Sequence, residues 1–273
     1  MILIAIILGT LLAGVGSVWL SAALSFRILE KHTNHMLSFA AGALLSTALL
    51  HLLPESLQSD QDAHTLLSVF LVGVIFFFLL DKAQLWHHGH EHGSHSHSDS
   101  HSSLEGHHHH YHHANVSSPE QKNTGAWSIL TGDAVHCFGD GILIASAFMA
   151  DFKLGILAAL SVLIHETPHH MGDLLVLRSA KNSRKTALLK VSLSGAVTVI
   201  GGLLGYFLLE TIDALQPFIL VLASSSFIYV ALADLIPQLQ KKLPIQDTII
   251  QIIWLFSGIA LVHLISLLGG HSH

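Results

Sequence analysis

The chain has 273 residues, of which 51% are hydrophobic and only 11% are charged. A soluble domain carries about 25% charged residues, and the mean hydropathy of +0.58 also lies far above that of such a domain. The composition therefore predicts an integral membrane protein. A formal net charge of −6 excludes the basic surface of a nucleic-acid-binding protein, and a single cysteine excludes an intramolecular disulfide.

Eight apolar runs follow one another along the chain, each close to the roughly 20 residues that a membrane-spanning helix needs. They cover residues 2–24, 37–57, 63–81, 126–150, 155–177, 187–209, 217–238 and 246–268. All eight should be helices, because lipid cannot satisfy free backbone groups and the alternation of barrel strands is absent. The first run has no basic residue before it and is expected to stay as a span. The prediction is one polytopic all-α domain over residues 1–273.

The basic residues predict the orientation of this domain. Eleven of the twelve Lys and Arg residues lie in or beside the connections after spans 1, 3, 5 and 7, and only Lys153 lies on the opposite side. The positive-inside rule makes the side with eleven cytoplasmic, so both termini should face outward. The expected location is a bacterial plasma membrane, with the lipid bilayer as a partner and no nucleic acid.

A histidine-rich segment interrupts the apolar pattern between the third and fourth spans. Residues 87–113 hold 13 of the 24 histidines, and residues 82–124 are predicted to be a disordered cytoplasmic loop, because they cannot build a core. Exposed imidazoles chelate metal ions, although a tail without a role is also open. The candidate loop ligands are His87, His88, His90, His92, His95, His97, His107, His108, His109 and His110.

Two spans carry ionisable side chains, each of which costs at least ~2.5 kcal/mol near the bilayer centre. The fourth contains DAVHCFGDG at 133–141 and the fifth contains HETPHHMGD at 165–173. At about 100° per residue, each set falls on one stripe of its helix. Imidazoles and carboxylates on facing stripes suit Zn²⁺ and other first-row divalent ions. The residues are Asp133, His136, Cys137, Asp140, His165, Glu166, His169, His170 and Asp173.

The His-Glu-x-x-His pattern at 165–169 leaves three functions open. On a regular helix this pattern is the zinc signature of metalloproteases, but Pro168 is expected to kink the helix inside the motif, because proline removes its N–H and clashes with the carbonyl of Ile164. Kinked helices at the binding site are common in transporters. A metal carrier is therefore favoured over an intramembrane protease. A metal-selective channel is the third reading, although no selectivity-filter loop is recognisable.

The segments HCFGDGILIASAF (136–148) and HETPHHMGD (165–173) resemble the fourth- and fifth-helix signatures of the ZIP (zinc/iron-regulated-transporter-like) family, in its His-Glu-x-Pro-His subgroup. The segments FAAGALLSTALLHLLPES (39–56) and FIYVALADLIPQL (227–239) resemble its second and seventh helices. The resemblance implies eight helices, with spans 1–3 and 6–8 related by inverted symmetry around spans 4 and 5. It also implies a non-enzymatic carrier, often dimeric, that moves Zn²⁺ into the cytosol, with Fe²⁺, Mn²⁺ and Cd²⁺ as further candidate substrates.

Carried over residue by residue, the resemblance implies a principal metal site of His136, Asp140, His165 and His169. It implies a second, adjacent site of Cys137, Glu166 and His169. The chain departs from the family pattern where Cys137 replaces the usual Asn, His170 replaces a Glu, and Gln238 stands where a Glu is common. Whether Cys137 binds metal or packs as a small hydrophobe is left open by the sequence.

Further polar residues outline a path for the ion. His51 and Glu55, one turn apart at the outer end of the second span, are candidates for the entry, although an interfacial cap is the alternative. Asp133 and Asp173 lie on the cytoplasmic side of the site on the same stripes and are candidates for the exit, with His170 beside them. Asp234, in the seventh span, is a weaker candidate.

Overall fold

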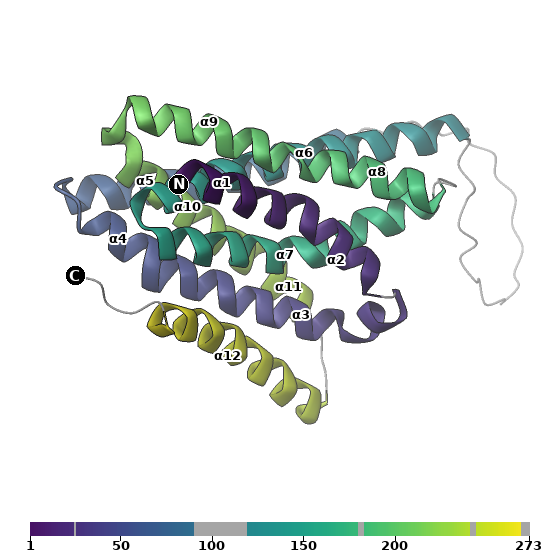
Figure 1. The fold of residues 1–273 in the computed structure, drawn as a ribbon. Helices are drawn as coiled ribbons and strands as arrows, with labels where there is room; N and C mark the ends of the chain where they lie inside the picture. The colour runs from purple at the N-terminus through teal and green to yellow at the C-terminus, as the bar shows by residue number, and fades with distance from the viewer. Residues whose placement is uncertain (25, 90–118, 180–182, 241–243, 269–273) are drawn as a thin grey trace, which may run out of the picture.

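The computed structural model describes residues 1–24, 26–89, 119–179, 183–240 and 244–268 (Figure 1). Every regular element in these ranges is a helix, which confirms the all-α prediction. The α-helices and the shorter π- and 3-10 segments (η) are α1 (Ile2–Leu11), η1 (Leu12–Gly16), α2 (Ser17–Ala23), α3 (Phe26–Thr47), η2 (Ala48–Leu52), α4 (Leu53–Leu57), α5 (Ala63–Gly89), α6 (Pro119–Ala150), α7 (Phe152–Ser179), α8 (Arg184–Gly195), α9 (Val197–Thr211), η4 (Asp213–Leu215), α10 (Gln216–Tyr229), η5 (Val230–Leu235), α11 (Ile236–Leu239) and α12 (Ile245–Leu268).

Seven helical runs within the described ranges are long and apolar enough to cross a membrane. They are Ile2–Ala23, Thr33–Leu57, Ala63–Leu80, Leu130–Ala150, Arg184–Thr211, Asp213–Leu239 and Ile245–Leu267, all within a few residues of the predicted spans. The integral membrane class is thereby confirmed. Helix α7, which corresponds to the predicted fifth span, is 28 residues long but is not among the seven, because its second half carries the buried ionisable residues. The count of eight is therefore not confirmed.

The helices divide into an interior set and a peripheral set. Helix α7 lies inside the bundle and contacts α2, α3 and α6, whereas α12 lies along its outer edge (Figure 1). Within the apolar window of each run, 61% of the residues of Thr33–Leu57 and 56% of Leu130–Ala150 are buried, but only 11% of Ala63–Leu80 and of Ile245–Leu267. The two spans with predicted metal ligands, α6 and α7, therefore belong to the interior set.

The helix pairings agree with the inverted arrangement that the resemblance implies. Helix α3, in the second span, packs on α12 in the eighth, and α10, in the seventh span, packs on α5 in the third. The first span packs on the sixth through α1 and α9. If spans 1, 2 and 3 are exchanged with spans 6, 7 and 8, respectively, the same three pairings result.

Glycines allow the closest of these helix contacts. A Cβ atom at Gly141 would lie 2.0 Å from the carbonyl oxygen of Thr198, and one at Gly201 would lie 2.0 Å from the carbonyl oxygen of Phe138. The same relation joins α3 and α12, where a Cβ at Gly258 would lie 2.2 Å from the carbonyl oxygen of Phe39. In a bilayer, where no hydrophobic force drives helices together, small residues permit the close backbone packing that holds them.

Local irregularities fall in the first, second and seventh spans, where the π-helical segments η1, η2 and η5 interrupt the α-helices. Such segments widen one turn and often occur at functional sites. Helix α7, in contrast, continues as an α-helix across Pro168, so the predicted kink does not interrupt it. The sixth span is divided at Ala196, between α8 and α9.

Described helix ends next to the basic connections gather at one end of the bundle (Figure 1). The C-terminal ends of α2 and α7 and the start of α8 lie together there, while α4 lies at the opposite end (Figure 1). Helices α5 and α6 extend to Gly89 and from Pro119, into the range predicted as a loop. Residues 90–118, with most of the histidine-rich segment, lie outside the described residues.

Candidate metal centre

Two groups of four side chains meet between α6 and α7. The first group is defined as His136, Asp140, His165 and Glu166, and the second group as Asp133, Cys137, Glu166 and His170. Within each group, the candidate ligand atoms all lie within 4.8 Å of one another. Glu166 belongs to both groups, so the two positions lie on either side of one carboxylate.

The first group has the spacing of a metal-binding cage. His136 Nε2 lies 3.3 Å from Glu166 Oε1 and 3.8 Å from Asp140 Oδ2. His165 Nε2 lies 3.2 Å from the same Glu166 oxygen and 3.5 Å from the same Asp140 oxygen. A tetrahedral zinc ion with nitrogen and oxygen ligands at its usual bond lengths holds them about 3.3–3.5 Å apart. Two imidazoles and two carboxylates therefore converge on one ion-sized volume.

These four atoms are also buried without hydrogen-bond partners. His136 Nε2, Asp140 Oδ2, His165 Nε2 and Glu166 Oε1 each have almost no solvent-accessible area and no hydrogen bond. A buried polar atom without a partner is costly, and a buried charge more so. Four such atoms that point at one another are expected where a cation supplies the missing interaction.

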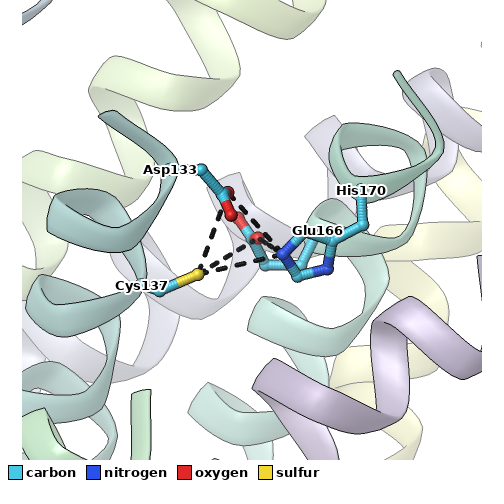
Figure 2. Close-up of side chains that lie close together, drawn as sticks. All are labelled: Asp133, Cys137, Glu166 and His170. Carbon is cyan, nitrogen blue, oxygen red and sulfur yellow. Dashed lines mark hydrogen bonds and ion pairs between the residues drawn. The ribbon is translucent and has the colours of Figure 1, made fainter. Parts of the chain in front are cut away.

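The second group joins a thiol to nitrogen and oxygen ligands, as Figure 2 shows for the four side chains. Cys137 Sγ lies 3.9 Å from Asp133 Oδ1, from Glu166 Oε2 and from His170 Nε2. His170 Nε2 lies 3.2 Å from Glu166 Oε2 and 3.6 Å from Asp133 Oδ1. All four residues are buried, and Asp133, the least enclosed of them, is 9% exposed.

Two of the imidazoles are oriented by hydrogen bonds, one within α7 and one from α2. His165 Nδ1 lies 3.0 Å from the carbonyl oxygen of Ser161, which can only accept, so Nδ1 carries the proton and Nε2 presents its lone pair to the first group. Ser17 Oγ donates to the carbonyl oxygen of Gly14 at 2.7 Å and lies 2.9 Å from His170 Nδ1. The single proton of the hydroxyl is used in the bond to Gly14, so Ser17 Oγ accepts a hydrogen bond from His170 Nδ1. The other ring nitrogen, His170 Nε2, then presents its lone pair to the second group.

The remaining predicted residues of α7 lie around the two groups. The ring of His169 stacks on that of His136, with centroids 5.9 Å apart and planes 26° apart, but His169 is exposed and belongs to neither group. Asp173 is buried, and its Oδ2 atom has no hydrogen-bond partner. In the structure Glu166 lies beside His165, and His169 lies outside both groups.

The two predicted entry residues lie in other elements than the two groups. His51 is in η2 and Glu55 in α4, toward the end of the bundle opposite the C-terminal end of α7 (Figure 1). His51 is partly buried, and its Nε2 atom has no hydrogen-bond partner. The side chains of Asp234 and of the predicted loop histidines lie outside the described residues.

Two features of the centre had no signal in the sequence. One is the position of Glu166 between the groups, which depends on how α6 meets α7. The other is the role of Ser17, one of many small polar residues in apolar spans, which only the approach of α2 to α7 identifies.

Comparison with known proteins agrees with this geometry. The family model described as ZIP zinc transporter matches residues 1–266. Similar curated proteins are zinc transporter foi of Drosophila melanogaster, 34% identical over 155 residues, zinc transporter ZIP4 of Homo sapiens, 35% over 144 residues, and zinc transporter ZIP10 of Homo sapiens, 32% over 164 residues. These alignments cover 56%, 53% and 55% of this chain but only 22%, 21% and 20% of those proteins, so the chain spans about a fifth of their length. Because the family model matches nearly the whole chain, the chain belongs to the ZIP zinc transporter family.

Proposed function

We propose that the chain carries divalent transition-metal ions across a membrane, with Zn²⁺ as the main substrate and the cytosol as the destination. The observation that carries this proposal is the convergence of four unpartnered ligand atoms from His136, Asp140, His165 and Glu166 inside the bundle. The names of the similar proteins, all zinc transporters, support the choice of metal. Fe²⁺, Mn²⁺ and Cd²⁺ are further candidate substrates.

The position of Glu166 favours a carrier over the protease reading of the same motif. In a metalloprotease, the Glu of His-Glu-x-x-His is a general base that faces a metal-bound water. Here Glu166 is 1% exposed, and its two oxygens lie 3.2–3.3 Å from three imidazole nitrogens, as ligands do. We therefore propose no enzymatic activity. A closed set of ligands also suits a carrier better than a channel, whose filter must let ions pass between weak sites.

The path of the ion follows the polar stripes of α6 and α7. His51 and Glu55 are proposed to receive the ion at the outer end, and His169, exposed beside His136, to pass it to the first group. Asp133, His170 and Asp173 then form the exit, with Asp234 as a further candidate. The predicted ligand role of His169 is retained in this form, as a group at the mouth of the site.

The other predictions from the sequence are retained as proposals. The eleven basic residues favour a cytoplasmic face at their end of the bundle and both termini outside. The histidine-rich loop is proposed to bind metal without carrying it. A homodimer is implied by the resemblance alone. The animal origin of the similar proteins does not support the predicted placement in a bacterial plasma membrane.

Uptake of Zn²⁺ into proteoliposomes that contain the full chain tests the proposal. The wild type should show saturable uptake, and His165→Ala should abolish it, because His165 is a buried ligand of the first group. His64→Ala is the matched control, since His64 is exposed at the start of α5 and belongs to neither group. Equal uptake by wild type and His165→Ala would overturn the proposed site. Uptake no faster than that of empty liposomes would overturn the proposed activity.

A further inference from the structure

We propose that Cys137 and His170 make the second group, Asp133, Cys137, Glu166 and His170, select thiophilic divalent cations, of the Zn²⁺ and Cd²⁺ class, over Mn²⁺ and Mg²⁺. The proposal deepens the proposed function and rests on it, because it takes α6 and α7 to pass a divalent ion. Its basis is the set of contacts in Figure 2, which includes Cys137 and His170, two of the positions where this chain departs from the family pattern.

The spacing of the second group suits a tetrahedral ion. Zinc–sulfur bonds of about 2.3 Å and zinc–nitrogen or zinc–oxygen bonds of about 2.0–2.2 Å place the ligand atoms of a tetrahedron about 3.3–3.6 Å apart. The five distances among Cys137 Sγ, His170 Nε2, Asp133 Oδ1 and Glu166 Oε2 that involve sulfur or nitrogen range from 3.2 to 3.9 Å. Contraction by a few tenths of an ångström around Zn²⁺ completes the cage, and a larger ion such as Cd²⁺ needs less.

The two departures change the chemistry of the position together. With Asn and Glu at 137 and 170, as in the family pattern, this group would offer only oxygen ligands, which suit Mn²⁺ and Mg²⁺. Cys137 and His170 replace them with sulfur and nitrogen, which favour Zn²⁺ and softer ions. Their ligand atoms lie 3.9 Å apart, so both substitutions act on the same ion.

The surroundings of Cys137 argue against a simple packing role. A cysteine that packs as a small hydrophobe is expected among apolar side chains. Cys137 is 1% exposed, yet its sulfur faces two carboxylate oxygens and an imidazole nitrogen. Binding of a cation releases the thiol proton and converts this polar surrounding into a complete ligand set.

Ser17 is the positioning residue for this site. Its hydroxyl accepts from His170 Nδ1, which keeps the lone pair of Nε2 directed at Cys137 and Glu166. Partners of this kind set the tautomer and orientation of metal-binding histidines. Ser21, one turn later in α2, provides a matched comparison, because its hydroxyl binds the backbone oxygens of Ser17 and Thr167 but no histidine ring.

The test uses the thiolate-to-cadmium charge-transfer absorption of the purified full chain titrated with Cd²⁺. Cys137 is the only cysteine, so the band can arise from no other residue, and the histidines of the loop cannot contribute to it. The wild type should develop the band, which Zn²⁺ should displace and Mn²⁺ should not. Cys137→Ser should lack it. Ser17→Ala should require about tenfold more Cd²⁺ to reach half amplitude, while Ser21→Ala should match the wild type.

The outcomes separate this proposal from the proposed function. A wild type without the band, or a band displaced equally by Mn²⁺ and Zn²⁺, would overturn the selective position. Equal titrations for Ser17→Ala and Ser21→Ala would overturn the role of Ser17, and circular dichroism shows whether each variant remains folded. A wild type that shows the band but no uptake in proteoliposomes would retain the second position and reject transport. A wild type that shows uptake but no band would retain transport and reject the second position.

Discussion

Helices α7 and α12 show opposite relations between hydrophobicity and burial. Helix α12 belongs to an apolar span with a mean hydropathy of 2.1, yet only 11% of that span is buried, and Phe256 is 62% exposed. Helix α7 carries His165, Glu166 and His170, and each is at most 1% exposed. In lipid, apolar side chains lose nothing by facing outward, whereas ionisable ones must be enclosed. The helix that carries these ionisable residues therefore lies inside the bundle.

The largest predicted difference between the two helices concerns their acidic residues. Glu166→Gln on α7 should lower Zn²⁺ uptake by at least about a hundredfold, because it removes the charge that both metal groups share, and even indirect partners of metal ligands contribute 10–100-fold. Asp247→Asn makes the same change on the exposed start of α12 and should leave uptake unchanged. Proteoliposome uptake measures both. Similar losses in the two variants would mean that Glu166 acts through overall charge.

A second difference concerns packing. Leu174 on α7 is 3% exposed and Leu264 on α12 is 51% exposed. Leu174→Ala should lower the free energy of unfolding by about 2–5 kcal/mol, because it leaves a cavity, while Leu264→Ala should change it by less than about 0.5 kcal/mol. Denaturant unfolding in detergent micelles measures this. If Leu264→Ala proved as destabilising, α12 would be covered by protein, for example by a second copy of the chain.

Glycine substitutions should have the opposite ranking, with the larger loss of stability on α12 and the smaller on α7. A Cβ at Gly258 of α12 would lie 2.2 Å from the carbonyl oxygen of Phe39, whereas a Cβ at Gly172 of α7 would meet nothing within 4 Å. Gly258→Ala should therefore destabilise the protein by about 1–3 kcal/mol through overpacking, and Gly172→Ala should be neutral or slightly stabilising. Thermal unfolding of the two purified variants decides between them. A tolerated Gly258→Ala would mean that α12 can move away from α3.

The smallest effect is expected outside both helices. Deletion of residues 90–118 should leave Zn²⁺ uptake within about twofold of the wild type, since loop segments outside a packed core tolerate removal. The site residues lie in α6 and α7 and do not depend on this segment for any contact described above. Uptake by the deletion variant at equal protein content tests this. Complete loss in a folded variant would place the histidine-rich loop in the path of the ion.

Much of the fold could be predicted because the sequence carries its signals locally. The apolar runs gave seven helices to within a few residues, since the thickness of the bilayer sets their length. The polar stripes likewise identified α6 and α7, because ionisable residues in a span are too costly to occur without a role. The same ionisable residues lower the mean hydropathy of the fifth span. Its composition alone therefore does not identify it as a membrane span.

The grouping of the ligands was less predictable. His165 and His169, one turn apart, were expected to bind the same ion, but the rotation of α7 against α6 buries His165 and leaves His169 exposed. Glu166, also a predicted metal residue, lies beside the imidazoles of His136 and His165. The sequence restricts each side chain to a stripe about 100–140° wide, which is too coarse to decide which members of two stripes come within 4 Å.

The sequence by itself determined that this protein is a helical membrane protein with candidate metal ligands in two spans, because hydrophobic length and the cost of buried charge depend on local composition. Only the tertiary structure decided that Glu166 lies between two groups, that Cys137 meets His170, and that Ser17 orients that imidazole. Those contacts depend on the distance and rotation of α2, α6 and α7, which are set by close packing at small residues far apart in the chain. No local pattern records that geometry.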